Sequence, residues 1–539
     1  MVLAAVGAGG GGRGRQVAGS LPMVATSDDT DPHPGGRRGV LPVLQAVALA
    51  VIAVLPPFLT GALAVGIRSE LGFGPGALGI AVALYFVTSS LCSSVLGPLV
   101  ERLGIRPSLA IGAGLSAASL VGLGLAPRYA ILLVALVIGG AGNAITQPAV
   151  GALLSQRIPS GRLGLAFGIK QSAIPGATLL GGLLVPTLAV LVGWRATFLT
   201  MAVVAALGGV GAFLGTQRQD PGVTRRRRRL RDIPEFRSLA ILSLGGGIGS
   251  AAATSLGSFL VDSAVVSGIP ESTAGLLIAL ASAFGLTSRI GLGWYADRRP
   301  TRSRYGGIGM LLFLGVPGYV LLSIGLPATY VAGSIVAYGA GWAWAGLLHY
   351  AAVSQTPTAP AAATGVVQVG MSLGAGLGPL AFGVVAERVS YGAAWIMAAA
   401  LSGLGGAIFL YGRAHLRRAR RTASAARLSE VTALRWDDQD FRPVTDGVES
   451  QARTTDHLHV TVYRTDPGSS FDAPAPGRTG VVLNMGSEDV ELHVAGIPQL
   501  CAGGDHLTLP AFRRWTVRNV GTGPATLAQV EHHGNGPAG

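Results

Sequence analysis

Charged residues are scarce in this 539-residue sequence, because Asp, Glu, Lys and Arg together supply only 12% of it. The mean hydropathy is correspondingly positive, at +0.52. Composition bounds the class of a protein before any motif is considered, and these values argue against a purely soluble fold. The formal charge of +14 comes from arginines in short clusters between apolar runs, a pattern that indicates membrane topology and not nucleic-acid binding.

Cysteine is nearly absent. Cys92 and Cys501 are too few for a disulfide framework or a CxxC metal site, so redox chemistry is not indicated. A secretory signal is also missing, since the Gly-rich residues 1–36 contain no apolar core of about 7 to 15 residues followed by a cleavage site. We expect residues 1–39 to form a disordered cytoplasmic leader, with Met23 as an alternative start.

Apolar runs of roughly twenty residues are abundant, and each is long enough at about 1.5 Å per residue to cross a ~30 Å hydrocarbon layer. The 82 glycines suit such helices, because small residues let membrane helices pack closely. The runs predict twelve spanning helices near residues 40–66, 76–99, 106–126, 128–155, 163–191, 194–215, 238–263, 272–296, 305–325, 328–354, 363–386 and 391–411. A basic cytoplasmic loop, residues 217–237 with Arg225–Arg229, separates two expected six-helix domains, residues 40–216 and 238–413.

Arginine content sorts the loops into two sets, and positive residues are retained on the cytoplasmic side. The richer set contains Arg37, Arg38, Arg102, Arg106, Arg157, Arg162, the central loop, Arg298–Arg304 and Arg417–Arg421. The alternate loops hold only scattered arginines such as Arg68, Arg128, Arg195 and Arg388. We therefore expect a multi-pass protein of the inner (cytoplasmic) membrane with both termini in the cytoplasm.

The composition changes after Ala414. A charged linker, residues 414–455, leads to short alternating segments bounded by Gly and Pro, which are typical of β-strands. We predict an all-β domain over residues 456–531 and a tail over residues 532–539.

A loop motif of Gly, three residues, an acid and Arg occurs after the second predicted helix and again after the eighth. Its residues are Gly97, Glu101, Arg102, Gly104 and Arg106 in the first copy, and Gly293, Asp297 and Arg298 in the second. Such internal symmetry indicates duplicated halves. The glycine allows close helix approach, and we expect the acid and the Arg to pair and hold one closed state.

This duplicated motif resembles the loop signature of the major facilitator superfamily, over about residues 40–413. The resemblance implies an all-α membrane protein with twelve helices in two six-helix bundles. It also implies a monomeric carrier that moves a small solute through the bilayer by alternating access, with neither enzymatic activity nor a cofactor. The first copy departs from the family pattern at Glu101, where Asp is usual, and at Ile105, where a basic residue is usual.

Two cations fall inside predicted spans, namely Arg289 and Lys170, the single lysine of the chain. A charge at the bilayer centre costs about 3 kcal/mol, so such residues usually line a cavity. No Asp or Glu lies in the middle of a span, and an unbalanced positive cavity favours an anion, with Arg289 in bidentate contact with a carboxylate. The alternatives are that Lys170 extends to the interface and that Arg289 binds a helix carbonyl.

Uncharged polar residues at helical spacing extend this candidate substrate site. They are Asn143, Gln147, Tyr338, Trp342, His349 and Gln368. His349 is the one histidine within a span, and its ordinary pKa range suits a proton carrier if transport is proton-coupled. The alternative for each is polar contact between helices without a role in transport.

Two shorter resemblances refine the family. Ser288–Asp297 is similar to the eighth helix of monocarboxylate-type and oxalate/formate-type carriers, in which an Arg four residues before the motif glycine meets the substrate. Phe167–Pro175 resembles a segment of cyanate and nitroimidazole-type permeases.

Residues 456–531 resemble the cupin family through Val481–Gly486, Gly503–Pro510 and Asn519. Metal-binding cupins carry an early HxH and Glu set and a later His. Trp515 stands at the position of that later His, and His457 and His459 come too early for the HxH motif. We therefore expect a metal-free domain that senses a ligand, contacts the transporter or stabilises it.

Three functions remain open from the sequence. The first is secondary transport of a small organic anion. The second is efflux of drug-like compounds, which commonly relies on a membrane carboxylate when the substrate is a cation. The third is a membrane receptor that binds a solute and signals through the β domain.

Overall fold

The computed structural model describes most of the chain from Val40 to His532. The described residues are 40–157, 162–215, 236–298, 304–356, 360–432, 440–454, 458–476, 480–494, 497–509 and 515–532. The predicted leader 1–39, most of the basic loop 217–237 and the tail from 533 lie outside them.

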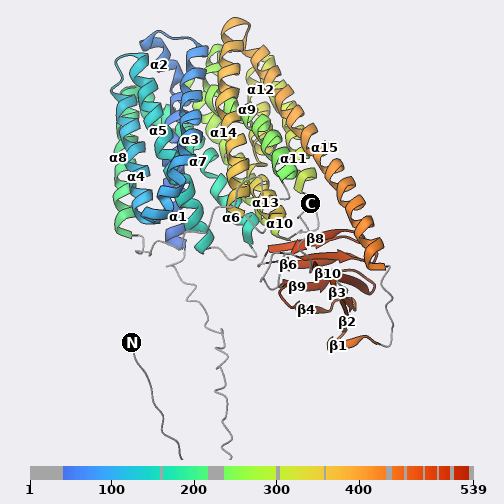
Figure 1. Cartoon of the computed structure of the whole chain (residues 1–539). Helices are drawn as coiled ribbons and strands as arrows, with labels where there is room; N and C mark the ends of the chain where they lie inside the picture. Colours follow the sequence, from blue (N-terminus) through green and yellow to red (C-terminus); the bar gives the residue numbers. More distant parts are fainter. Residues whose placement is uncertain are drawn as a thin grey trace, which may run out of the picture.

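Two helical bundles stand side by side, and a small β domain lies below the second one (Figure 1). The first bundle contains α1 (Val40–Ala62), α2 (Ala64–Leu71), α3 (Pro75–Leu103), α4 (Ile105–Gly124), α5 (Tyr129–Arg157), α6 (Leu163–Gln171), α7 (Ala173–Leu184), the π-helix η2 (Val185–Ala189) and α8 (Val190–Gly215). The second contains α9 (Phe236–Val266), α10 (Glu271–Arg298), α11 (Arg304–Ile324), α12 (Pro327–Val336), the π-helix η4 (Ala337–Gly341), α13 (Ala345–Gln355), α14 (Pro360–Arg388) and α15 (Tyr391–Thr432).

Eleven segments of the described chain are long and apolar enough to cross a membrane. The longest, Leu163–Leu214, has 52 residues, whereas one span needs about 20. Gly193 interrupts it with φ 83° and ψ 164°, a conformation that only glycine adopts readily. This segment therefore provides two spans, and the predicted twelve-span, two-bundle fold is confirmed.

The alternating helices define two ends of the membrane part. We call the end that carries the β domain the domain-side end and the opposite one the far end. The helix bounds place the arginine-rich connections, including Arg102, Arg162 and Arg298, at the domain-side end, and Arg128 and Arg388 at the far end. The arginine asymmetry in the sequence thus corresponds to two real ends of the molecule.

Close backbone contacts join the two bundles. A methyl group on Gly79 of α3 would lie 2.4 Å from the carbonyl oxygen of Pro379 in α14, and one on Gly182 of α7 would lie 2.6 Å from that of Gly275 in α10. Side chains larger than hydrogen would separate these helices. Glycine therefore acts here as the packing residue that the composition indicated.

The β domain consists of two antiparallel sheets. Its strands are β1 (Arg442–Thr445), β2 (Val448–Thr454), β3 (Leu458–Thr465), β4 (Ser470–Ala473), β5 (Gly480–Asn484), β6 (Val490–Val494), β7 (Ile497–Cys501), β8 (His506–Leu509), β9 (Trp515–Asn519) and β10 (Ala525–His532). The six-stranded sheet has the order β1-β2-β3-β10-β5-β8, and the four-stranded sheet the order β4-β9-β6-β7. The predicted C-terminal all-β domain is confirmed.

Apolar side chains fill the space between the two sheets. Tyr463, Phe471 and Trp515 pack against one another there, with ring centroids 4.9 to 6.5 Å apart. Burial raises the pKa of Tyr463 to about 12. Trp515, which the sequence resemblance set at the position of a metal-binding His, is thus part of the hydrophobic core.

The connection between the last span and the β domain differs from the prediction. The sequence suggested a linker over residues 414–455, but α15 continues without a break to Thr432, and β1 and β2 precede residue 456. Arg, Ala and Leu dominate residues 414–432 and are among the best helix formers, so the helix has no reason to end at the membrane.

Candidate functional site

Two broken helices, one from each bundle, face each other in the middle of the membrane part. In the first bundle α6 ends at Gln171, and α7 begins at Ala173. Pro175 has no N–H, so the carbonyl of Gln171 has no helical donor four residues later. Broken spanning helices are frequent at transporter binding sites, because their freed backbone groups need other partners.

Arg289 of α10 supplies those partners. Its Nη1 donates to the carbonyl of Gln171, while Nε and Nη2 donate to the carbonyl of Trp342 at 3.0 and 2.7 Å. Trp342 follows the π-helix η4 and ends it, with φ −115°. Arg289 is 1% exposed, and it thus bridges the two helix breaks as a carbonyl-bound residue, which was the alternative interpretation from the sequence. Two of its five N–H groups make no hydrogen bond to a described residue.

His349 of α13 continues this contact between the bundles. Its Nδ1 lies 2.9 Å from the Gln171 side-chain nitrogen, and its Nε2 lies 3.2 Å from Oε1 of Gln368 in α14. Gln368 in turn donates to Ser372 at 3.2 Å. The ring of Phe167 stacks on the imidazole with centroids 5.8 Å apart. A buried polar chain therefore runs from α6 through α13 to α14.

Lys170 lies next to this chain on α6. It is half-buried, and its Nζ would be 3.2 Å from a methyl group on Gly151 of α5. No hydrogen bond or ion pair joins Lys170 to another residue that the structure describes. Lys170 precedes Gln171, whose side chain contacts His349 and whose carbonyl accepts from Arg289, so the two cations lie near the same imidazole. We name Lys170, Gln171, Arg289, His349 and Gln368 the central cluster.

The other predicted site residues divide into two groups. Asn143 donates to Ser89 at 2.8 Å and accepts from Gln147 at 3.2 Å, all within the first bundle. Gly151 follows Gln147 by one helical turn, so this polar pair shares a face of α5 with the contact to Lys170. Trp342 and Tyr338 are buried in the second bundle, with ring centroids 5.3 Å apart. Among the described residues no hydrogen bond joins Asn143 or Gln147 to the central cluster.

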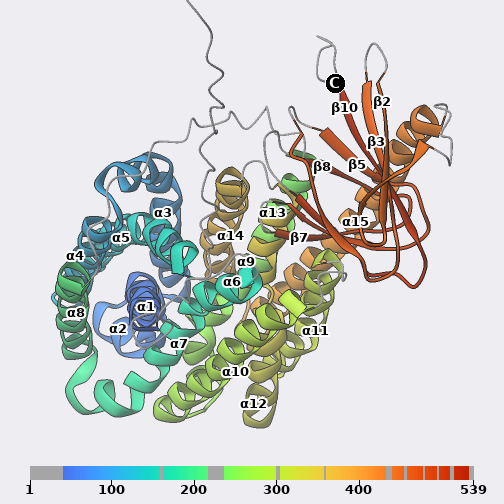
Figure 2. The ribbon, with the colours of Figure 1, turned by 90° about the horizontal axis from the view of Figure 1, so that it is seen from below.

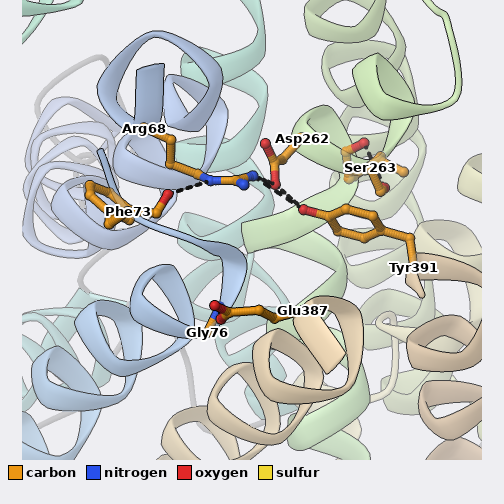
Figure 3. Close-up of polar contacts among 8 residues, drawn as sticks. Arg68, Phe73, Gly76, Asp262, Ser263, Glu387 and Tyr391 are labelled. Carbon is orange, nitrogen blue, oxygen red and sulfur yellow. Dashed lines mark hydrogen bonds and ion pairs between the residues drawn. The ribbon is translucent and has the colours of Figure 1, made fainter. Parts of the chain in front are cut away.

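Carboxylates of the spanning helices lie only at helix ends in the described chain. Asp262, near the far end of α9, accepts hydrogen bonds from Arg68 of α2 and Tyr391 of α15 (Figure 3). Arg68 also donates to the carbonyl of Phe73 at 3.2 Å. We name Arg68, Asp262 and Tyr391 the far-end clasp. Because Arg68 and Asp262 belong to different bundles and stand 194 positions apart, the sequence alone did not reveal their pairing.

A second contact strengthens the same end. The carboxylate of Glu387, at the end of α14, accepts a hydrogen bond of 2.8 Å from the backbone N–H of Gly76 at the start of α3 (Figure 3). The first N–H groups of a helix have no partner within the helix, and a negative charge there is favourable. The far end is therefore closed by two polar contacts between bundles.

The domain-side end is closed by the motif acid Asp297. Its carboxylate accepts hydrogen bonds of 2.7 and 2.8 Å from the backbone N–H groups of Gly164 and Leu165, at the start of α6. The expectation that Asp297 pairs with Arg298 was wrong, since Arg298 instead lies over the Trp294 ring at 3.8 Å. Successive helix residues point about 100° apart, so the acid faces the other bundle while the Arg faces away.

The first copy of the motif has a different arrangement. Arg106 donates to the carbonyl of Phe213 and lies over its ring at 4.6 Å, within the first bundle. Gly104 joins α3 to α4 with φ 84°, a conformation that requires glycine, and Arg102 is exposed. Gly97 and Glu101 belong to α3, and the structure does not describe the contacts of these two residues.

Gly293 brings α10 against α6. A methyl group on it would lie 2.4 Å from the carbonyl oxygen of Gly164, whereas one on Gly291 would meet nothing within 4 Å. We expect Gly293→Ala to destabilise the closed domain-side end by about 1–3 kcal/mol, the usual range for overpacking. The thermal unfolding midpoint of the purified protein should be lower for Gly293→Ala than for the wild type. The matched variant Gly291→Ala should keep the wild-type midpoint. Equal midpoints for the two variants would show that this close approach is unimportant.

Comparison with known proteins identifies the family. The family model described as Major Facilitator Superfamily matches residues 44–362 and again 268–445. The tetracenomycin C resistance and export protein of Streptomyces glaucescens is 29% identical over 172 residues, which cover 31% of each chain. An uncharacterized MFS-type transporter of Mycobacterium tuberculosis is 26% identical over 331 residues, 56% of this chain and 69% of its own. The match to the export protein thus spans about a third of that relative.

Solved structures show the same fold. A bacterial homologue of the human lysosomal transporter Spinster, in an inward-facing and occupied conformation, superposes with a TM-score of 0.55. The superposition covers 69% of this chain and 96% of that one, at 16% identity. The inward-facing, unoccupied form gives a TM-score of 0.53 at 18% identity. With twelve spans in two bundles and a family match over most of its length, the chain belongs to the major facilitator superfamily.

Proposed function

We propose that this transporter moves a small organic anion, of carboxylate type, by alternating access between the two ends described above. The observation that carries the proposal is Lys170, a half-buried cation in a spanning helix with no ion pair to any described residue. Arg289 adds two uncommitted N–H groups nearby. An uncompensated charge inside a membrane is costly, and an anionic solute would compensate it.

The central cluster suits this role chemically. The Lys170 ammonium and the guanidinium of Arg289 offer charge-assisted hydrogen bonds, which are about twice as strong as neutral ones. Gln171 and Gln368 provide neutral donors and acceptors for the rest of a solute. Arg289 also binds the carbonyls of both helix breaks, so an anion that contacts its free N–H groups would stabilise the joined arrangement of the two bundles.

Orientation and direction belong to the same proposal. In the inner (cytoplasmic) membrane the arginine-rich domain-side end would face the cytoplasm, and the far end would face outward. Export is a second candidate, because one relative is named as a resistance and export protein. The receptor alternative rests only on the attached β domain, which we regard as a metal-free, cupin-like accessory of a monomeric carrier.

We further propose that His349 couples transport to protons. A neutral ring protonated on Nε2 accepts from Gln171 and donates to Gln368, whereas a charged ring cannot accept on Nδ1. The carbonyl of Ala345 lies 3.1 Å from Nδ1 and would take the new proton instead. Protonation would thus replace the hydrogen bond between His349 and Gln171, which joins the two bundles, with one between His349 and Ala345 within α13. A proton on His349 would therefore weaken the contact between the bundles.

The variant His349→Gln tests this coupling. It keeps hydrogen-bonding capacity but cannot titrate, so transport should continue at a lower rate and lose its dependence on a pH gradient. The rates of uptake into proteoliposomes with and without a gradient give the comparison. If His349→Gln retains the gradient dependence of the wild type, another group carries the proton.

An uptake screen in proteoliposomes tests the proposed function itself. Radiolabelled anionic, neutral and cationic solutes of similar size would be offered in both orientations of a pH gradient. We expect accumulation of a carboxylate-type anion and none of the cations. Transport of cations or neutral solutes only would overturn the anion proposal, and binding without flux would favour the receptor.

A further inference from the structure

A cleft lies at the far end of the membrane part, where the two bundles meet. Its volume is about 170 Å³. The lining includes Leu63, Gly66, Ala189, Gly193 and Trp194 of the first bundle, together with Glu271 at the start of α10 in the second. Because α10 lies beside α7 and η2, the cleft is part of the seam between the bundles (Figure 2). We name it the far-end cleft.

Glu271 is the charged group of this cleft, and its carboxylate makes neither a hydrogen bond nor an ion pair with another described residue. Among the described residues, the other far-end carboxylates all accept hydrogen bonds, namely Glu70, Asp262 and Glu387. The arginines of this end are engaged as well, since Arg68 binds Asp262 and Arg195 binds Glu70. Glu271 is half-buried, so its carboxylate remains available to a ligand in the cleft.

The rest of the lining is apolar and fixed in place. Leu63 and Trp194 are 1% and 7% exposed, and the indole of Trp194 is held by a 2.8 Å hydrogen bond to Glu70. Gly193 leaves space, because a methyl group on it would meet nothing within 4 Å. A cavity needs about 10–15 Å³ to hold one water molecule, so this cleft has room for roughly ten groups of that size.

An apolar cleft with one unpaired carboxylate selects its ligand by charge. A cation would form a charge-assisted hydrogen bond with Glu271, about twice as strong as a neutral one, whereas an anion would be repelled. An apolar body would be removed from water against Leu63 and Trp194. The adjoining surface of α8 is apolar too, since Val190, Leu191 and Val192 are 54% to 75% exposed. A ligand with an apolar body and a cationic head would thus reach the cleft from the bilayer surface.

We propose that the far-end cleft binds a small amphipathic amine, with its ammonium on Glu271 and its apolar part against Leu63 and Trp194. Such a ligand contacts both bundles at once. A ligand shifts an equilibrium by the difference between its affinities for the two states, and opening the far end would separate the walls of the cleft. The bound amine therefore holds the far end closed and inhibits transport. The charge of this site is opposite to that of the central cluster, so the amine does not compete for the site of the transported anion.

Binding of tritiated phenethylamine to the purified full chain tests the site. We expect saturable binding to the wild type and at least tenfold weaker binding to Glu271→Gln, which has nearly the same shape but no charge. Glu70→Gln should bind like the wild type, because that carboxylate is paired with Arg195 and the amide oxygen can still accept from Trp194. Phenethyl alcohol, the neutral analogue, should displace the label at least tenfold less well. Absence of saturable binding, or equal affinities for the wild type and Glu271→Gln, would overturn the proposal.

Filling the cleft gives a second test that leaves the charge in place. Ala189→Phe would occupy the space beside Glu271, whereas Thr187 is exposed on the same π-helix and is not part of the lining. We expect Ala189→Phe to abolish phenethylamine binding and Thr187→Phe to retain it. Equal binding to these two variants would place the amine elsewhere.

The effect on the far end is measured separately. Spin labels at Leu125 and Val389, after replacement of Cys92 and Cys501 by Ala, would report the separation of the bundles at this end. Phenethylamine should increase the share of the short distance in otherwise wild-type protein and leave Glu271→Gln unchanged. No shift in the former, or a shift toward longer distances, would contradict the closing effect. None of these measurements needs a transported solute, so their outcome is independent of the anion proposal.

Discussion

Replacing Asp262 with Asn is expected to open the far end and to reduce transport at least tenfold. Asp262 is the acceptor for both Arg68 and Tyr391, and its side chain is 3% exposed. Breaking a fully buried ion pair typically costs about 3–5 kcal/mol. Since the Arg68 side chain is 21% exposed, solvent weakens the pair, and we expect about 2 kcal/mol, or a roughly 30-fold shift toward the open far end.

A matched control is available in the same region. Glu70 and Arg195 form an ion pair of 2.7 Å within the first bundle, with the Glu70 side chain 48% and the Arg195 side chain 35% exposed. The hydrogen bond from Arg195 lowers the pKa of Glu70, so this carboxylate stays charged at neutral pH. Exposed pairs contribute little, and Glu70→Gln should leave the equilibrium as in the wild type.

The measurement uses spin labels at Leu125 and Val389, which are 62% and 72% exposed at the far end of the two bundles. Asp262→Asn should lengthen the distance between them, and Glu70→Gln should not. If both variants keep the wild-type distribution, the far-end clasp does not hold the bundles together.

The second large effect is expected at Lys170. Lys170→Gln removes a spanning-helix cation that has neither a hydrogen bond nor an ion pair among the described residues, and keeps a side chain of similar length. A hydrogen bond to a charged group contributes about 1.5–3 kcal/mol, so the affinity for the anion should fall roughly 10- to 150-fold. Lys170→Arg retains the charge and should retain most of the affinity.

Equilibrium binding of the radiolabelled anion to purified protein would give these affinities directly. Thermal unfolding serves as the control, because removing an unpaired charge from the membrane should leave the midpoint unchanged or raise it. Equal affinities for the wild type and Lys170→Gln would exclude Lys170 from the site.

The polar contacts at the two ends give a physical picture of how access could alternate. Asp297 binds the start of α6 at the domain-side end, while Asp262 and Glu387 bind the other bundle at the far end. In the present state both ends are joined. Each end is held by a few polar contacts between bundles, as the proposed alternation of access requires. The central cluster lies between them and includes Arg289, which joins both helix breaks.

The spans were predictable because hydrophobic length is a local property. Even the break between the fifth and sixth spans lies close to the predicted boundary, at Gly193. The continuation of α15 was missed because the predicted linker was inferred from its charge and not from its helix propensity. Charge alone does not end a helix.

The site was predictable only in part. Residue type and depth identified Arg289, Lys170 and His349, because intramembrane charges and histidines are rare. Their partners were not predictable. Pro175 is visible in the sequence, yet only the fold brings Arg289 to the Gln171 carbonyl that Pro175 leaves free. Contacts between the bundles connect residues over a hundred positions apart, and no local pattern encodes them.

The most direct test of the account compares a transported carboxylate with its neutral carboxamide, which has nearly the same shape. In proteoliposomes containing the wild type we expect the carboxylate to be transported at least tenfold faster. In Lys170→Gln, which lacks the positive charge, the ratio of the carboxylate rate to the carboxamide rate should fall close to one. Equal rates for the two solutes in the wild type, or an undiminished preference in the variant, would show that positive charge in the central cluster does not select the solute.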